Sequence, residues 1–350
     1  MVQSSMNILI TGGAGFIGSN LADYFLRKGD EVTVFDNLSR KGTEKNLEWL
    51  RGNHKELNFI KGDIRKFDQI LSSVKDIDAV FHCCAQTAVT TSIKNPREDF
   101  EINALGTFNV LEAVRQSKKN PIIIFCSTNK VYGSNVNKIP LIEKETRYEF
   151  ADEEYKFGIP ESFPTDATKH TPYGCSKYTG DLYVRDYYEI YGLRNVTLRM
   201  SCCYGIRQWG TEDQGWLAHF VISSVFGKPL IIFGDGRQVR DVLFIDDLIK
   251  AFELAIENIN KTKGQVYNIG GGPENTISLL ELLSMLNKIG LKPKYSFDAW
   301  RSADQKVYIS DIRKAKEFGW EPKISVKDGV RKLVEWVNTN KNLFQKHFLT

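Results

Sequence analysis

Residues 8–20 read ILITGGAGFIGSN, an apolar run followed at once by a glycine-rich turn and the start of an amphipathic stretch. The glycines fit both Gly13-x-Gly15-x-x-Gly18 and Gly12-x-x-Gly15-x-x-Gly18. Glycines here let the backbone turn sharply and approach a pyrophosphate, whose charge is stabilised by the amides and dipole of the following helix. The stretch therefore predicts a strand, a dinucleotide-binding turn and a helix.

Acidic residues at the ends of the next two apolar runs support a dinucleotide. Asp36 would accept hydrogen bonds from the adenosine ribose and repel the extra phosphate of NADP, which favours NAD. Arg40 and Lys41 follow closely and could neutralise that phosphate, so NADP stays open. Asp63 and Ile64 are placed to meet the adenine edge, although Asp63 could equally cap a helix.

Apolar, β-rich runs alternate with helix-like stretches over the first 200 residues. This alternation predicts parallel strands joined by right-handed crossovers, hence a doubly wound α/β sheet of the Rossmann type with helices on both faces. The predicted strands cover residues 8–10, 32–35, 59–60, 79–83, 122–126 and 196–200.

Beyond about residue 200 the alternation becomes irregular, and a second, smaller α/β lobe is expected to begin. Strand-then-helix character returns near residues 241–272. We therefore expect a dinucleotide-binding domain of residues 1–200 plus about 241–272, and a substrate-binding lobe of about 201–240 plus 273–350. Residues 146–170 form a polar, turn-rich insertion.

The segment HTPYGCSKYTGDLYV places Tyr173 and Lys177 four residues apart, on one face of a helix that Pro172 would begin. A free phenol has a pKa of about 10, so Tyr173 needs a nearby cation, such as Lys177, to act as a base. An exposed helix pair has the same spacing, but the glycine turn favours catalysis. Thr128 ends a predicted strand and could orient the reacting hydroxyl, or bind local backbone groups.

Composition excludes several other classes of protein. The 47 basic and 43 acidic residues are interspersed, which argues against a nucleic-acid partner. Six cysteines without a Cys-x-x-Cys motif suggest reduced thiols and no metal site. No signal peptide and no membrane-spanning segment is recognisable, so a cytoplasmic enzyme that does not enter a membrane is expected.

Together these motifs make the chain similar, over nearly its whole length, to the extended short-chain dehydrogenase/reductases that act on nucleotide sugars. It resembles in particular the branch of CDP-paratose 2-epimerases, or CDP-tyvelose epimerases, through FDNLSRKGTEKNLEWL, CSTNKVYG, ETRYEF, HTPYGCSK and DQGW. The resemblance implies an NAD-dependent isomerase that oxidises and re-reduces carbon 2 of CDP-paratose, in lipopolysaccharide O-antigen synthesis. It also implies a homo-oligomer, a dimer or tetramer, formed through helices near residues 98–118 and 172–191.

The resemblance carries specific roles to residues of this sequence. The catalytic residues would be Thr128, Tyr173 and Lys177. The cofactor would be bound by Gly12, Gly15, Phe16, Ile17, Gly18, Asp36, Asn37, Ser39, Arg40, Asp63, Ile64, Asn103, Tyr173 and Lys177. The substrate would be bound by Thr128, Gln208, Gln214, Arg240 and Arg301. Both arginines suit a diphosphate, although ion pairs with Asp241 or Asp304 are the alternative.

The chain also departs from its relatives. Relatives that eliminate water or carbon dioxide carry an acidic residue after the catalytic threonine, where this chain has Asn129 and Lys130. Cys126 replaces a frequent serine, and Cys202 replaces an asparagine of 4-epimerases that contacts the diphosphate. These differences favour epimerisation over dehydration. A sugar-nucleotide 4-epimerase remains the rival enzyme, and a dinucleotide-sensing regulatory protein without catalysis is the alternative from another class.

Overall fold

The computed structural model describes residues 5–301 and 304–348, and the chain divides into two compact units. Unit 1 holds Met1–Thr128, Pro172–Arg199 and Ile249–Tyr267, and unit 2 holds Asn129–Thr171, Met200–Leu248 and Asn268–Thr350. This division differs from the boundaries expected from the sequence, chiefly at residues 129–171. That segment falls in unit 2 because its hairpin bonds there, with Tyr148 N donating to Arg237 O at 3.0 Å.

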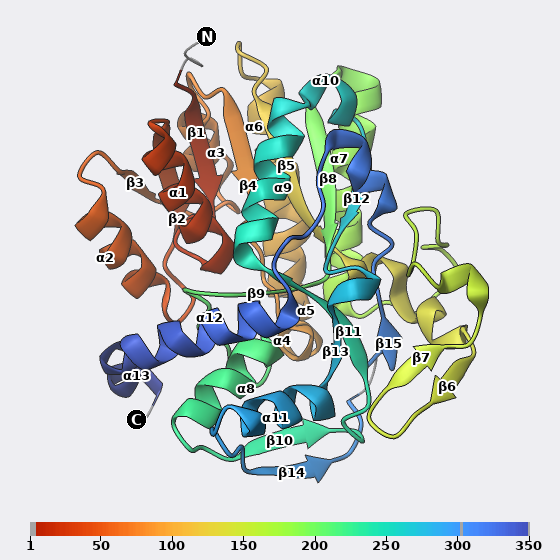
Figure 1. Ribbon diagram of the computed structural model, residues 1–350. Coiled ribbons are helices and arrows are strands. Elements are labelled where there is room, and N and C mark those ends of the chain that lie inside the picture. Colours follow the sequence, from red (N-terminus) through yellow and green to blue (C-terminus); the bar gives the residue numbers. More distant parts are fainter. Residues whose placement is uncertain (1–4, 302–303, 349–350) are drawn as a thin grey trace. The chain divides into compact units, whose positions relative to one another are not determined.

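Unit 1 is built on a seven-stranded sheet with the order β12-β8-β5-β4-β1-β2-β3. The pairs from β3 through β5 are parallel, and the strand order reverses between β1 and β4. This confirms the doubly wound Rossmann sheet (Figure 1). Its strands are β1 (Asn7–Thr11), β2 (Glu31–Asp36), β3 (Asn58–Lys61), β4 (Ala79–His82), β5 (Ile122–Thr128), β8 (Asn195–Met200) and β12 (Val266–Ile269).

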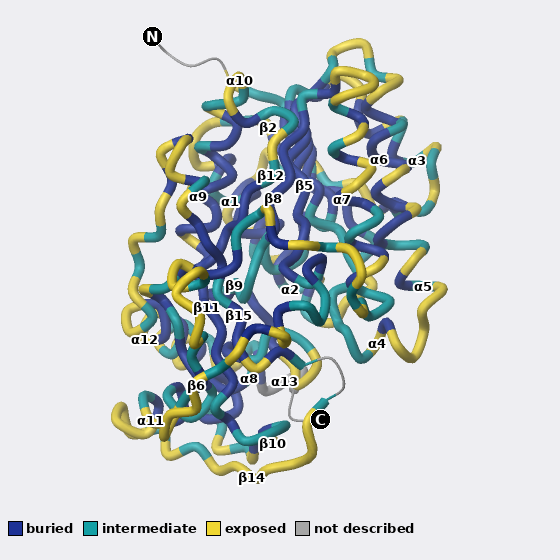
Figure 2. Tube along the Cα trace, turned by 90° about the vertical axis from the view of Figure 1, so that its right-hand side faces the viewer, coloured by how far each residue is buried: buried dark blue, intermediate teal, exposed yellow. Residues whose placement is uncertain are grey.

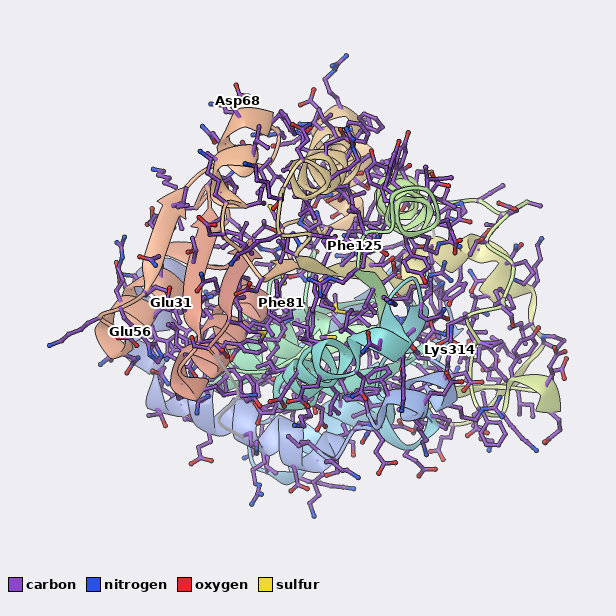
Figure 3. The ribbon with its side chains drawn as sticks, turned by 90° about the horizontal axis from the view of Figure 1, so that it is seen from above. Glu31, Glu56, Asp68, Phe81, Phe125 and Lys314 are labelled. Atoms are coloured by element: carbon purple, nitrogen blue, oxygen red, sulfur yellow. The ribbon has the colours of Figure 1, made fainter. Side chains whose placement is uncertain are left out.

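Helices cover both faces of this sheet. Phe81 of β4 stacks on Phe25 of helix α1 and meets Phe252 of helix α9 edge-on, while Phe125 of β5 packs with residues of α6 and α7 on the other face (Figure 3). The helices are α1 (Phe16–Lys28), α2 (Thr43–Asn53), α3 (Phe67–Ser73), α4 (Val89–Lys94), α5 (Pro96–Phe100), the π-helix η1 (Glu101–Leu105), α6 (Gly106–Arg115), α7 (Pro172–Tyr191), α9 (Ile245–Glu257) and α10 (Ile259–Thr262).

Strands β4 and β5 of this sheet are buried along their whole length. Every residue of β5 is buried, and Figure 2 shows this strand within the dark-blue interior of unit 1. Strands covered on both faces need apolar side chains at consecutive positions, not at alternate ones. Burial on two faces therefore explains the uninterrupted apolar runs of the sequence.

Unit 2 contains three smaller sheets: β13-β11-β15 with β9 beside β11, the parallel pair β10-β14, and the hairpin β6-β7. The strands are β6 (Leu141–Glu143), β7 (Tyr148–Phe150), β9 (Cys202–Tyr204), β10 (Leu230–Phe233), β11 (Val239–Phe244), β13 (Thr276–Ser278), β14 (Tyr295–Asp298) and β15 (Val307–Tyr308). The helices are α8 (Trp216–Val225), α11 (Leu279–Lys288), α12 (Val326–Thr339) and α13 (Lys341–Phe348), with 3-10 turns η2 (Asn129–Lys138), η3 (Glu153–Tyr155), η4 (Pro273–Asn275) and η5 (Arg313–Phe318).

Candidate active site

The glycine turn joins β1 to α1 so closely that side chains are excluded. Gly12 N donates to Phe35 O at 2.8 Å, and Gly15 N donates to Gly12 O at 3.0 Å. A Cβ at Gly12 would lie 2.7 Å from the backbone of Cys84, and one at Gly18 would lie 2.3 Å from Gly12 O. Gly12 also has φ +68, which side chains rarely adopt. Glycine is therefore required at both positions.

The start of α1 suits an anion. Gly15 is the N-cap residue and provides no side-chain cap, and the first turn, which begins with Phe16 and Ile17, has no acidic residue. The amides at a helix start carry partial positive charge and need acceptors from outside the helix. This turn therefore fits the pyrophosphate of a dinucleotide, as predicted for NAD.

Asp36 closes the glycine turn from the end of β2. Its carboxylate accepts hydrogen bonds from Ala14 N at 3.0 Å and from Leu38 N at 2.8 Å. Burial raises the pKa of Asp36, and these two hydrogen bonds oppose that shift. The next residues form a polar turn in which Ser39 N donates to Asn37 Oδ1 at 3.0 Å. The structure thus brings Asp36, Asn37 and Ser39 together beside the glycines.

Asp63 follows β3 and forms a close ion pair. Arg65 Nη2 lies 2.6 Å from Asp63 Oδ2, and this contact holds the pKa of Asp63 below its usual range. Its side chain does not cap α3, whose N-cap residue is Lys66. Asn37 Nδ2 lies 3.5 Å from Asp63 Oδ2, which links the ends of β2 and β3. Ile64 is buried in the core of unit 1.

All three residues predicted for catalysis belong to unit 1, and two of them, Tyr173 and Thr128, are in contact. Tyr173, in the first turn of α7, hydrogen-bonds through its hydroxyl to the side chain of Thr128 at the end of β5. Lys177 is 2% exposed, and its Nζ lies 4.4 Å from the ring centroid of Phe125. Burial raises the pKa of Tyr173 to about 12, and the hydrogen bond with Thr128 opposes the shift. Burial lowers the pKa of Lys177.

Arg40 contacts the loop after β4 and acts on Tyr173. Its Nη1 donates a hydrogen bond to Thr87 Oγ1. The positive charge of Arg40 also lowers the pKa of Tyr173, so the guanidinium is near the phenol. The structure thus offers Tyr173 a nearby cation.

Asn103 occupies the π-helical turn η1, a type of distortion that is frequent at functional sites. Its side chain accepts from Gln86 N at 2.9 Å and donates to Gln86 O at 3.0 Å. Asn103 Nδ2 also lies 3.2 Å from Asp99 Oδ1 and 3.1 Å from Ser176 Oγ. The side chain predicted for the cofactor therefore fixes the loop after β4 against α7.

Two buried carboxylates around α7 were not predicted from the sequence, Asp99 and Asp181. Asp181 is fully buried and accepts from Ser127 Oγ at 2.7 Å and from Arg199 Nε at 3.0 Å. It ties α7 to β5 and β8. Its spacing of four residues from Lys177 was the available signal, because it places both on one helix face.

In unit 2, the residues predicted for substrate binding lie on β11 and on loops. Arg240 is 9% exposed, its Nη1 donates to Val239 O at 2.8 Å, and no ion pair with Asp241 is found among the described residues. Arg301 pairs with Glu212 at 3.0 Å instead of with Asp304, and its guanidinium lies 3.8 Å from the ring centroid of Phe233. Both alternative ion pairs considered from the sequence are therefore wrong.

The two glutamines differ in how they are held. Gln208 is 3% exposed and donates to Cys203 O at 3.3 Å, while its Oε1 is buried without a hydrogen-bond partner in the described part of the chain. Gln214 closes a turn, with its backbone O accepting from Thr211 N at 2.9 Å. The buried oxygen of Gln208 is thus suited to accept a hydrogen bond from a ligand.

Lys130 and Cys202 also belong to unit 2. Lys130 Nζ lies 3.3 Å from Gln305 Oε1, and burial lowers the pKa of Lys130 to about 8. The charges of Arg240 and Cys202 also affect this ammonium, so the three side chains are near one another. Two positions at which the sequence was expected to differ from its relatives, Lys130 and Cys202, therefore lie near Arg240.

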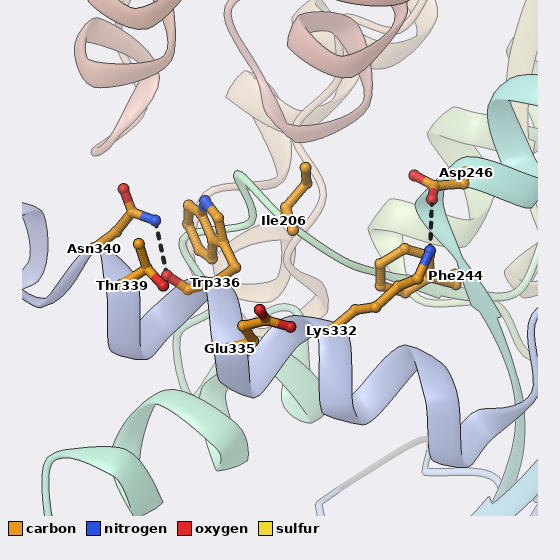
Figure 4. A pocket seen from close by; sticks show the side chains of 8 residues that line it. All are labelled: Ile206, Phe244, Asp246, Lys332, Glu335, Trp336, Thr339 and Asn340. Carbon is orange, nitrogen blue, oxygen red and sulfur yellow. Dashed lines mark hydrogen bonds and ion pairs between the residues drawn. The ribbon is translucent and has the colours of Figure 1, made fainter.

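A separate groove of about 320 Å³ lies in unit 2, between α12 and the end of β11 (Figure 4). Lys332 Nζ lies 3.3 Å from Asp246 Oδ2 across it, and Asn340 Nδ2 donates to Trp336 O at 2.8 Å. None of the residues that line it was predicted for the site. In the described part of the chain, no helix has the length and apolar character needed to cross a membrane.

Comparison with known proteins places the chain in a family. The GDP-mannose 4,6 dehydratase family matches residues 9–333. The chain is 44% identical to the CDP-paratose 2-epimerase of Salmonella typhi, over 95% of this chain and 100% of that enzyme. It is 34% identical to a putative UDP-glucose 4-epimerase of Methanocaldococcus jannaschii, over 95% of this chain and 99% of that protein.

Solved structures agree with this assignment. The UDP-glucose 4-epimerase of Thermus thermophilus in complex with NAD superposes with a TM-score of 0.79 at 29% identity, covering 96% of this chain and 100% of that one. Members and neighbours are named epimerases and dehydratases of nucleotide sugars. The chain belongs to the GDP-mannose 4,6 dehydratase family of extended short-chain dehydrogenase/reductases, as its motifs predicted.

Proposed function

We propose that this protein is an NAD-dependent epimerase that converts CDP-paratose to CDP-tyvelose by inverting carbon 2. One observation carries the proposal: the chain matches a CDP-paratose 2-epimerase over that enzyme's full length at 44% identity, against 34% for a putative 4-epimerase. The hydrogen bond between Tyr173 and Thr128, with Lys177 buried on the same helix, supports catalysis and argues against a purely regulatory protein.

NAD fits the residues of unit 1. The glycine turn carries no side chain at Gly12, Gly15 and Gly18, and the uncapped start of α1 offers amides to a pyrophosphate. Asp36 supports NAD over NADP, because a buried carboxylate would repel a 2′-phosphate. Arg40 and Lys41 favoured NADP in the sequence, but Arg40 donates a hydrogen bond to Thr87 Oγ1. When bound, NAD would accept hydrogen from the sugar as hydride and return it.

The residues of the chain would move the proton. Tyr173 Oη would take the proton of the hydroxyl at carbon 2, and Thr128 Oγ1 would orient that hydroxyl. Because burial raises the pKa of Tyr173 to about 12, the phenolate needs nearby positive charge. Lys177 and Arg40 would supply it. The 2-keto sugar would then turn about its diphosphate linkage and be reduced on its other face, with Tyr173 returning the proton.

We further propose that unit 2 binds the nucleotide diphosphate. Arg240 and Arg301 would contact its phosphate oxygens, which guanidinium groups match in geometry. Gln208 and Gln214 would contact the sugar or base. The arrangement of Arg301 supports this, since stacking on Phe233 fixes the plane of its guanidinium.

A homodimer is proposed through α6 and α7. Both helices expose apolar side chains in unit 1: Phe108 (37%), Leu182 (45%), Tyr183 (44%), Ile190 (64%) and Tyr191 (51%). Contiguous apolar surface of this kind is typical of protein interfaces. A tetramer would need a further interface.

A product-resolved assay tests the proposed function. The purified protein is incubated with CDP-paratose and, separately, with UDP-galactose, and the products are identified by NMR spectroscopy. We expect CDP-tyvelose from the first substrate, with no added cofactor, because the oxidised dinucleotide is regenerated in each cycle. Conversion of UDP-galactose alone would instead support the rival 4-epimerase, and no turnover of any nucleotide sugar would support the regulatory alternative.

A further inference from the structure

Asp99 in α5 is a carboxylate that is 1% exposed and has no role in the chemistry proposed above. Burying an ionised carboxylate is unfavourable unless hydrogen bonds or opposite charge compensate. Burial raises the pKa of Asp99, whereas hydrogen bonds from Ser176 and Gln86 and the charge of Lys177 lower it. Its buried position therefore depends on these three partners.

The hydrogen bonds of Asp99 connect three segments of unit 1. Asp99 Oδ2 accepts from Ser176 Oγ of α7 at 2.6 Å. Asp99 Oδ1 accepts from Gln86 Nε2, in the loop after β4, at 2.8 Å, and from Asn103 Nδ2 of η1 at 3.2 Å. Charge-assisted hydrogen bonds of this kind are about twice as strong as neutral ones. The carboxylate therefore links α7 to α5, to η1 and to the loop after β4.

Ser176 transmits this anchoring to the catalytic residues. It lies directly before Lys177 and three residues after Tyr173, in the same turns of α7. Ser176 Oγ is also 3.1 Å from Tyr173 O, and Tyr173 N donates to Ser92 Oγ at 3.1 Å. The first turn of α7 is thus fixed by side chains from α4 and α5.

Asp99 also acts on Tyr173 through its charge. Asp99 from α5 and Cys126 from β5 raise the pKa of Tyr173, whereas Arg40 from the loop after β2 lowers it. Lys177 is the ammonium on the same helix face, and its charge also acts on Asp99. The phenol is therefore close enough to one carboxylate, Asp99, and to one cation, Arg40, for their charges to act on it.

We propose that Asp99 is a positioning residue of the active site. Through Ser176, whose Oγ contacts both Asp99 Oδ2 and Tyr173 O, it holds the first turn of α7 where Tyr173 meets Thr128. The inference rests on the proposed function in one respect, because it takes Tyr173 to be the base. Asp99 itself touches neither substrate nor cofactor in this role.

Four variants test the proposal. Asp99→Asn keeps the size and an acceptor for Ser176 but removes the charge, and Ser176→Ala removes the connection but keeps the charge. Asp99→Ala removes both. Glu101→Gln is the matched control, since Glu101 lies two residues further along the chain and pairs with the exposed Arg97 at 3.4 Å.

The first readout is the titration of Tyr173, measured by ultraviolet difference spectroscopy against the same variant in a Tyr173→Phe background. Removing a nearby negative charge stabilises the phenolate, so in Asp99→Asn the phenol should titrate at lower pH than in wild type. The acid limb of the kcat profile should move in the same direction. Ser176→Ala and Glu101→Gln should leave both unshifted.

The second readout is kcat against KM. Misplacement of Tyr173 should lower kcat by roughly 100-fold in Asp99→Ala and about tenfold in Ser176→Ala, with KM nearly unchanged. If Asp99→Ala does not fold, Asp99→Asn and Ser176→Ala carry the test. The proposal is overturned if Asp99→Asn titrates like wild type, or if Ser176→Ala lowers only the melting temperature.

Because the tyrosine titration needs no substrate, the two proposals fail separately. A protein that leaves CDP-paratose unchanged refutes the proposed function. An unshifted titration in Asp99→Asn refutes the role of Asp99.

Discussion

The proposed site residues of the two units are held in different ways. In unit 1, Tyr173, Asn103 and Asp36 are fixed by hydrogen bonds to neighbouring side chains or backbone, and Lys177 is buried. In unit 2, Arg301 is engaged by Glu212, so a phosphate would have to share or replace that partner. The difference suggests that the side chains for hydrogen transfer are preorganised before substrate binds. Substrate recognition, in contrast, would require Arg301 to exchange Glu212 for a phosphate.

Tyr173→Phe should have the largest effect, since it removes the proposed base from the fixed part of the site. We expect kcat to fall by roughly 10³-fold while the dinucleotide still binds, within the range of about 10²–10⁴-fold for acid–base groups. In wild type, kcat should rise with pH over the acid limb, because the raised pKa of Tyr173 must be overcome to form phenolate. Steady-state kinetics across pH measures both.

The matched control is Tyr183→Phe, on the same helix but 44% exposed. It should retain wild-type kcat. A Tyr173→Phe enzyme with undiminished turnover would show that another group takes the proton, and the contrast between the units would lose its chemical basis.

Gly18→Ala should act next most strongly, by disrupting the cofactor turn. The added Cβ would lie 2.3 Å from Gly12 O, a contact that the backbone must relieve by moving. We expect a loss of about 1–3 kcal/mol of stability and loss of bound NAD. Thermal melting and the absorbance of dinucleotide released on denaturation measure the two effects.

Gly52→Ala in α2 is the control, because a Cβ there has no neighbour within 4 Å. It should leave dinucleotide content unchanged. A Gly18→Ala protein that retains stoichiometric NAD would contradict the close approach inferred for this turn.

Arg301→Ala should affect binding rather than chemistry. Loss of a charged hydrogen bond to phosphate is worth about 1.5–3 kcal/mol, so KM should rise roughly 10- to 100-fold with kcat less affected. Arg331→Ala, which removes an arginine whose side chain is 75% exposed, should change neither constant. A fall in kcat alone for Arg301→Ala would show that Arg301 acts in catalysis. Unit 2 could then no longer be described as binding substrate without taking part in the chemistry.

Ile190→Glu should have the smallest effect on turnover. Ile190 is 64% exposed on α7, and a charge there should dissociate the proposed dimer while leaving the site of unit 1 intact. Sedimentation velocity should show a monomer with kcat within about threefold of wild type. Ile289→Glu, at a residue 52% exposed in unit 2, is the control and should not change the assembly. An unchanged sedimentation coefficient for Ile190→Glu would reject these helices as the interface.

The sequence predicted the sheet of unit 1 well, because burial on both faces leaves continuous apolar runs such as that of β5. The sequence could not show that residues 129–171 belong to unit 2, since the hairpin β6-β7 forms hydrogen bonds with residues far along the chain. Asp99 was missed for the same reason: its partners Gln86 and Ser176 come from separate segments. Arg40 follows Asp36 closely in sequence, but its long side chain reaches Thr87.

The central claim is that hydrogen is removed from carbon 2 of the sugar and returned to it. A deuterium label at that carbon reports this transfer most directly. CDP-paratose carrying deuterium at carbon 2 is converted by the purified enzyme, and the product is analysed by NMR spectroscopy and mass spectrometry. We expect CDP-tyvelose with the deuterium retained at carbon 2 and a slower reaction than with unlabelled substrate. Inversion at carbon 4 with no isotope effect from carbon 2 would contradict the account.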